Sequence, residues 1–187
     1  TELLDASEAQ IETTGKKLRA RIDEVITQLH MVVPVYMLFT KIDLVSGFVE
    51  FFGDMKKSDR AQVWGATVPL SVPKDDPGKL FDGEFDTMIK ALHGRALKRC
   101  AQERSREARE KLFRFPIELA ALKKNLSDLV GVTFAPNTFQ GTPMLRGFYF
   151  TSGTQEGRPL SRVVSGMLRA FNLGAAPATP DAAPTEA

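Results

Sequence analysis

The sequence predicts an α/β fold in which a mainly helical segment is inserted between two pieces built from strands and helices. Two short apolar runs, VVPVYMLF at 32–39 and MLRGFYFT at 144–151, are typical of strands. Apolar residues at helical spacing precede the first run, and two longer helical patterns lie between the runs. Helices alternating with buried strands indicate a layered α/β domain.

The first 53 residues predict a helix, a strand and a second helix. The run at 32–39 is rich in β-branched and aromatic residues, so we expect a strand buried on both faces, as in a parallel sheet covered by helices. A further helix is expected over Leu44–Phe52, with Gly53 ending it. The first helix is expected within Leu3–Leu29, because its apolar residues share one helical face: Ile11, Leu18, Ile22, Val25 and Leu29.

The middle of the chain predicts a mainly helical insertion over 54–143. Residues 64–70 can form one extended segment, and Lys74-Asp75-Asp76-Pro77-Gly78 is typical of a turn. A long helix is expected next, ended by Phe115-Pro116, and a second amphipathic helix is expected to end near Gly131. The apolar face of the long helix holds Phe85, Met88, Ile89, Leu92, Ala96 and Cys100, and that of the second holds Leu119, Leu122, Leu126 and Leu129.

The remaining residues complete the α/β part. Residues 152–159 predict a loop, and Leu160–Phe171 predicts a closing helix with Pro159 near its start. From Gly174 the chain contains small, proline and acidic residues and cannot bury enough apolar surface to order itself, so 174–187 is expected to be a disordered linker. We therefore expect a half-domain formed by 1–53 and 144–173, with 54–143 inserted between its two pieces.

Composition narrows the functional classes. The formal net charge is +2, so no global field favours nucleic acid or anionic membranes, and we expect no nucleic-acid partner. The single cysteine, Cys100, excludes an internal disulfide and suits a reducing cytosol. The longest apolar run, Met31–Phe39, is far shorter than the ~20 residues that cross a bilayer. Any membrane anchor is therefore expected outside this chain.

The first chemistry-bearing motif is Thr40-Lys41-Ile42-Asp43, directly after the first predicted strand. Nucleotide sites in open parallel sheets lie beyond the carboxyl ends of strands. A carboxylate at Asp43 can accept hydrogen bonds from N1 and N2 of guanine, and the stem of Lys41 can lie over the base. The motif resembles the base-specificity motif of GTPases, Asn/Thr-Lys-x-Asp. Alternatively, Asp43 caps the helix expected from Leu44.

The second motif follows the second predicted strand in the same way. In GTPases the corresponding strand ends in a Ser-Ala-Lys-like loop whose backbone supports the guanine O6. Ser152-Gly153 resembles that loop, although Thr154 stands in place of the lysine, and a simple glycine-rich turn before a helix is the alternative. The resemblance implies the C-terminal half of a P-loop GTPase-like three-layer fold, with Thr40, Lys41, Asp43, Ser152 and Gly153 as its nucleotide-binding residues.

The phosphate-binding parts of such a fold are missing from the sequence. It contains no G-x-x-x-x-G-K-[ST] motif and no recognisable Asp-x-x-Gly loop for Mg²⁺. Phosphoryl transfer depends on these groups for positioning and charge neutralisation. We expect no catalytic residue, no cofactor and no GTP hydrolysis in this chain alone, whereas the GTPase resemblance implies GTP and Mg²⁺ in the full-length protein.

Longer blocks resemble one family of secretion proteins. PVYMLFTKIDLVSGFVEFF, QVWGATVP, FRFPIELAALKKNLSDLV and LRGFYFTSGTQEGRPLSRV look like the cytoplasmic region of TssM/IcmF proteins, in order from about Val32 to Phe171. The resemblance implies a scaffold of the type VI secretion membrane complex at the cytoplasmic face of the bacterial inner membrane. It also implies a membrane-anchored parent and, as partners, a DotU/TssL-type inner-membrane protein and baseplate components.

Other candidate sites have simpler explanations. His30 and His93 lack companions at zinc-ligand spacing, so we expect no metal site. The basic stretch Lys90–Lys111 is interleaved with glutamates at helical spacing, which is typical of a solvated helix, although an anionic partner is the alternative. Three functional hypotheses follow: a scaffold that docks partners through the insertion, the guanine-recognition part of a nucleotide switch, and a small stand-alone adaptor that borrowed the fold.

Overall fold

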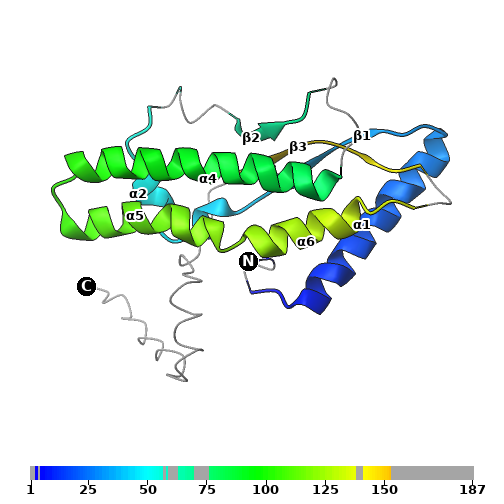
Figure 1. The fold of residues 1–187 in the computed structure, drawn as a ribbon, viewed down its shortest axis with the longest axis horizontal. Helices are drawn as coiled ribbons and strands as arrows, with labels where there is room; N and C mark the ends of the chain where they lie inside the picture. The colour runs from blue at the N-terminus through cyan, green and yellow to red at the C-terminus, as the bar shows by residue number, and fades with distance from the viewer. Residues whose placement is uncertain are drawn as a thin grey trace, which may run out of the picture.

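The computed structural model describes residues 3, 5–56, 58, 63–69, 76–137 and 141–152. Gly153, the predicted closing helix at 160–171 and the predicted linker at 174–187 lie outside these ranges. The described part is mixed α/β, with a small sheet and several helices (Figure 1). Its elements are α1 (Glu8–Leu29), β1 (Pro34–Phe39), the 3₁₀-helix η1 (Ile42–Leu44), α2 (Phe48–Phe52), β2 (Trp64–Thr67), α4 (Pro77–Gln102), α5 (Arg106–Ala120), α6 (Lys123–Thr133) and β3 (Met144–Phe150).

The two strands expected from the apolar runs are neighbours in one sheet. The strand order is β1-β3-β2, with β3 parallel to β1 and antiparallel to β2. The β1–β3 register shifts by one residue between Val35 and Tyr36 and then runs regularly to the pairing of Phe39 with Phe150. The carboxyl ends of β1 and β3 therefore lie side by side, which places the loops that follow them together.

The expectation that the first strand is buried on both faces is wrong within the described residues. Met37 and Phe39 are buried, whereas the alternating residues Tyr36 and Leu38 are 48% and 60% exposed. Successive side chains of a strand point to opposite faces, so only one face of β1 is covered. The described helices supply cover for that face alone.

The predicted first helix is confirmed, with its start fixed by a capping box. Ser7 is the N-cap residue: its hydroxyl accepts from the Gln10 N–H at 3.4 Å, and Gln10 Oε1 accepts from the Ser7 N–H at 2.8 Å. Near the middle of α1, Arg19 pairs with Asp23 at 2.8 Å and donates to the carbonyl oxygen of Ala135. The bond to Ala135 attaches α1 to the chain just after α6.

The long helical stretch divides at a different place from the one expected. Phe115-Pro116 does not end a helix; both residues lie inside α5 and are buried. The break falls at 103–105, where Ser105 caps α5 by accepting from the Ala108 N–H at 3.3 Å. Proline inside a helix costs about 3 kcal/mol, and the helix survives because tertiary burial around Phe115 offsets that cost.

The helix expected over Leu44–Phe52 is also interrupted. Ile42–Leu44 forms η1, and α2 begins at Phe48, after Gly47 in the left-handed region at φ 86°. A continuous helix would require right-handed φ at Gly47, whereas the observed turn directs Phe48 and Phe51 toward α5. Glycine permits this turn without a Cβ penalty.

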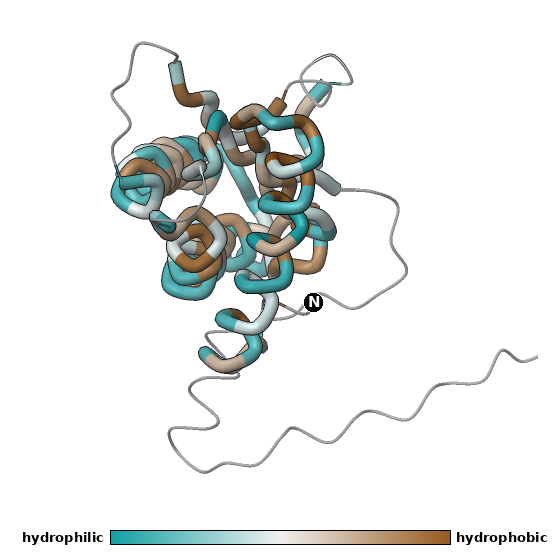
Figure 2. Tube along the Cα trace, turned by 90° about the vertical axis from the view of Figure 1, so that its right-hand side faces the viewer, coloured by the Kyte–Doolittle hydropathy of each residue, from teal (hydrophilic) through white to brown (hydrophobic). Residues whose placement is uncertain are grey.

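The helices of the expected insertion share a core with the strands. α4 lies alongside α5 and α6 (Figure 1), and hydrophobic and hydrophilic residues alternate along the helical turns (Figure 2). Phe81 of α4 contacts Phe39 of β1 and Phe148 of β3, with ring centroids 6.3 and 4.6 Å apart. The division into a half-domain and an insertion stays a prediction, but the two parts pack as one hydrophobic cluster.

Candidate functional site

The two predicted loops meet at the carboxyl end of the sheet. Thr151 N–H donates to the carbonyl oxygen of Phe39 at 2.9 Å, and Ile42 N–H donates to the carbonyl oxygen of Thr151 at 3.3 Å. These bonds join the chain after β1 directly to the chain after β3. Ser152, which is exposed, therefore lies on the same side of the molecule as Asp43. Gly153, the remaining predicted site residue, lies outside the described residues.

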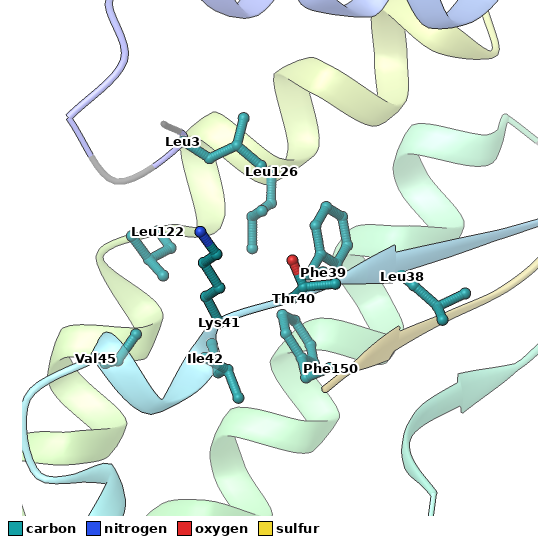
Figure 3. Close-up of a pocket in the computed structure, with 10 residues that line it drawn as sticks. All are labelled: Leu3, Leu38, Phe39, Thr40, Lys41, Ile42, Val45, Leu122, Leu126 and Phe150. Carbon is teal, nitrogen blue, oxygen red and sulfur yellow. The ribbon is translucent and has the colours of Figure 1, made fainter. Parts of the chain in front are cut away.

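A pocket of about 290 Å³ opens beside the first loop. Thr40 and Lys41 line it together with Phe39 and Phe150 at the strand ends, and Leu122 before α6 forms part of its wall (Figure 3). Most of the lining residues are apolar, so the pocket offers hydrophobic contact with few polar groups. Such a lining suits a planar or apolar ligand group more than a charged one.

The backbone at Lys41 adopts an uncommon conformation. Its φ is 62°, and among the described residues outside glycine only His30 shares a positive φ. This turn starts η1 and directs the Lys41 side chain from the loop toward Leu122 (Figure 3). Non-glycine residues at positive φ cost of order 1 kcal/mol and are concentrated at ligand-binding loops and tight turns.

One carboxylate oxygen of Asp43 receives no hydrogen bond in the structure. Its Oδ1 atom is shielded from solvent and has no hydrogen-bond partner, and the side chain caps neither η1 nor α2. The helix-cap interpretation is therefore wrong. A buried polar atom left unpaired costs about 1–3 kcal/mol, so a donor that reached this oxygen after the loop opened would recover part of that cost. Asp43 and Ser152 do not line the 290 Å³ pocket; Thr40 and Lys41 do.

Sequence reasoning missed part of the pocket. Leu122 and Leu126 were identified only as one face of a helix, yet they form the pocket wall opposite the loop, and Leu3 adds a residue from the start of the chain. Contacts between residues so far apart in sequence leave no local signal. A second pocket, of about 640 Å³, lies between α1 and β1 and was also not anticipated.

Ion pairs in the described part form both within helices and between neighbouring elements. The Lys111 amine pairs with Glu50 at 3.0 Å and with Glu107 at 3.1 Å. The hydrogen bond to Glu50, followed by the smaller effect of the one to Glu107, raises the pKa of this amine. The Lys111–Glu107 pair fits the solvated-helix interpretation of the basic stretch, whereas Arg95 and Arg99 of that stretch pair with Asp54. Among the described residues no group of histidine, cysteine and carboxylate side chains can hold a metal ion, and no helix is long and apolar enough to span a bilayer.

Comparison with known proteins identifies the family. The family model described as the IcmF-related N-terminal domain matches residues 1–186. The chain belongs to this family. Over 175 residues it is 41% identical to the type VI secretion system component TssM1 of Pseudomonas aeruginosa strain PAO1. The matched region covers 92% of this chain and 16% of that protein. No solved structure matches.

The resemblance to TssM/IcmF proteins is thereby confirmed, because the match includes both predicted loops. The IcmF-related chain spans about a sixth of its TssM1 relative. Its fold is confirmed as mixed α/β, whereas the derivation from a GTPase stays a prediction.

Proposed function

We propose that this chain is a structural segment of the type VI secretion membrane complex, at the cytoplasmic face of the inner membrane. The observation that carries the proposal is the 41% identity to TssM1 across 92% of the chain. Identity at this level over a whole domain preserves its core and much of its surface, so the segment would serve its relative's system in the same position. Its partners would be a DotU/TssL-type inner-membrane protein and baseplate components.

The surface of α5 supports a docking role. Phe113 and Ile117 are 49% and 36% exposed and lie one helical turn apart. Residues at i and i+4 are neighbours on a helix, so these two side chains form one apolar patch. Exposed aromatic residues framed by polar ones are typical anchors of protein interfaces. We name Phe113 and Ile117 the α5 patch.

The docking proposal predicts that Phe113→Ser combined with Ile117→Ser weakens capture of a purified DotU/TssL-type protein at least tenfold. Both apolar side chains of the proposed contact are lost, and because both are exposed, their replacement should not disturb the core. Affinity would be measured by biolayer interferometry on the full-length protein, with circular dichroism to confirm folding. The matched control is Leu97→Ser, an exposed apolar residue of α4 at 62% exposure, which should leave capture unchanged.

Two results would contradict this assignment of the docking surface. Unchanged capture by the double variant shows that the α5 patch is not the contact. An equal loss in the Leu97→Ser control shows that capture responds to general surface polarity instead.

A second candidate function is guanine recognition within a nucleotide switch, supported by the adjoining loops and the unpaired Asp43 Oδ1 atom. If the loop opens to expose that acceptor, it can take an N–H from the edge of guanine, and Lys41 lines the pocket beside the same loop. The outer edge of β1 pairs with no described strand, so further strands can extend the sheet there. Groups that bind phosphate and Mg²⁺ would have to come from such a part, and this chain alone would hydrolyse no GTP.

The nucleotide proposal predicts that Asp43→Asn in the full-length protein weakens GTP binding about ten- to a hundredfold, since a bidentate base contact contributes about 1–3 kcal/mol. Asparagine keeps one acceptor and replaces the second with a donor, which repels a guanine N–H. Calorimetry with GTP and ATP would measure the change. Asp128→Asn, at an exposed i,i+4 pair with Lys124, is the control. GTP affinity that is unchanged by Asp43→Asn would sink the proposal.

A further inference from the structure

One face of the sheet is uncovered in the described part of the protein. Tyr36 and Leu38 of β1 are 48% and 60% exposed, and Tyr149 of β3 stacks on Tyr36 with ring centroids 6.2 Å apart. Tyr36, Leu38 and Tyr149 are named the open sheet face. The opposite face carries Phe39, Phe148 and Phe150, which are buried beneath the helices. The two faces of one small sheet therefore differ sharply in burial.

Glycines make the open sheet face flat. A Cβ added to Gly147 would approach the Tyr149 hydroxyl oxygen to 3.1 Å, and one added to Gly65 would approach Cδ1 of that ring to 2.7 Å. The Tyr149 ring therefore lies across positions that have no side chain of their own. Its hydroxyl is fixed by Thr67, with 2.7 Å between the two oxygens. A flat, aromatic and aliphatic surface on which the Tyr149 hydroxyl is already bonded is suited to helix packing.

The pairing of β1 with β3 indicates that this face is covered in the folded protein. Sheets made only of parallel strands almost always have helices on both faces, and in this mixed sheet the exposed Tyr36 and Leu38 lie on β1, a strand of the parallel pair β1–β3. In open α/β sheets the chain leaves a parallel strand at its carboxyl end and returns as a helix packed on the sheet. β3 is the central strand, and the chain that leaves it begins at Thr151, at that end of the sheet.

The sequence after β3 contains a segment of matching pattern and length. Its apolar residues fall at i, i+3, i+4, i+7, i+8 and i+11, which forms one helical stripe: Leu160, Val163, Val164, Met167, Leu168 and Phe171. Arg162 and Arg169 fall on the opposite side of such a helix. Residues 160–171 would span about 18 Å as a helix, against roughly 23 Å for the seven residues of β3.

We propose that residues 160–171 pack as a helix on the open sheet face, with Val164 and Met167 toward Leu38 and with Arg162 and Arg169 toward solvent. The connection at 153–159 reaches up to about 24 Å when extended, which is enough to return from the carboxyl end of β3 to the middle of the sheet. The contact would complete a three-layer arrangement in which the sheet lies between two helical layers. It stands independently of both functions proposed above.

Disulfide cross-linking tests the contact directly. In a Cys100→Ala background of the 187-residue chain, Leu38→Cys would be paired in turn with Val164→Cys, Met167→Cys or Arg169→Cys, and mildly oxidised. We expect intramolecular cross-links at Val164 and Met167 at least tenfold faster than at Arg169, because the apolar stripe faces Leu38. Equal rates at all three positions, or disulfides that join two chains, would overturn the proposal; the latter would assign the face to a second copy.

Hydrogen exchange provides a measurement that needs no cysteines. Amides of 163–171 should exchange at least tenfold more slowly than in an unstructured peptide, and Leu38→Asp should remove that protection while α4 and α5 keep theirs. Leu97→Asp, at an exposed apolar residue outside the open sheet face, should leave the protection in place. Exchange of 163–171 at the unstructured rate in the unmodified chain would also overturn the proposal.

Discussion

Replacing Phe115 with alanine is expected to lower the free energy of unfolding by about 3–5 kcal/mol, the range for truncating a fully buried phenylalanine. The Phe115 side chain is 0% exposed. Its ring contacts Phe48, Phe51 and Phe52, with centroids 4.8 to 5.8 Å apart, and also Trp64 at 6.3 Å. Removing it would leave a cavity where α5, α2 and β2 meet.

The matched control lies two residues away in the same helix. Phe113 is 49% exposed, so Phe113→Ala should change the free energy of unfolding by less than about 1 kcal/mol. Urea denaturation followed by tryptophan fluorescence would measure both variants, since Trp64 adjoins Phe115. Phe115→Leu, which keeps most of the volume, provides an intermediate value if the alanine variant does not fold. Equal losses in the free energy of unfolding at 113 and 115 would mean that α5 does not turn Phe115 toward the core and Phe113 toward solvent.

The same residue shows where sequence reasoning ends. Phe115-Pro116 has the local signature of a helix break, because proline removes a backbone donor and clashes with the preceding turn. The helix continues because Phe115 is held by rings from α2 and β2, which lie far away in sequence. No window around Pro116 contains that information. In contrast, Ser105 and the polar residues around it carry a readable start signal for α5.

For the strands and the candidate site too, local sequence predicted some features and tertiary packing determined the others. The apolar runs predicted β1 and β3, and their polar endings placed Thr40, Lys41 and Ser152 at one end of the sheet. Continuous apolar runs do not reveal whether both faces are covered, so the exposure of Leu38 could not be foreseen. The unpaired Oδ1 of Asp43 is likewise a product of tertiary packing. Sequence thus located the loops, and packing decided what surrounds them.

Gly47→Ala is expected to destabilise the protein by about 2–4 kcal/mol, combining left-handed strain with a steric clash. Gly47 adopts φ 86° between η1 and α2, and a Cβ there would overlap the Lys111 carbonyl oxygen and approach the Phe115 Cβ to 3.1 Å. Both neighbours belong to α5, and one of them is backbone within a helix. Relief would require α2 or α5 to move, which would disturb the packing around Phe115.

Gly94→Ala is the matched substitution with the opposite expected sign. Gly94 lies inside α4, is exposed, and a Cβ there would meet no atom within 4 Å. Alanine in a helix interior is about 0.5–1 kcal/mol more favourable than glycine, so this variant should be more stable than the parent. Thermal and urea denaturation of the two variants would therefore diverge in opposite directions. A Gly47→Ala variant as stable as the parent, or more stable, would show that the turn at Gly47 does not press against α5, and the contact between α2 and α5 would have to be redrawn.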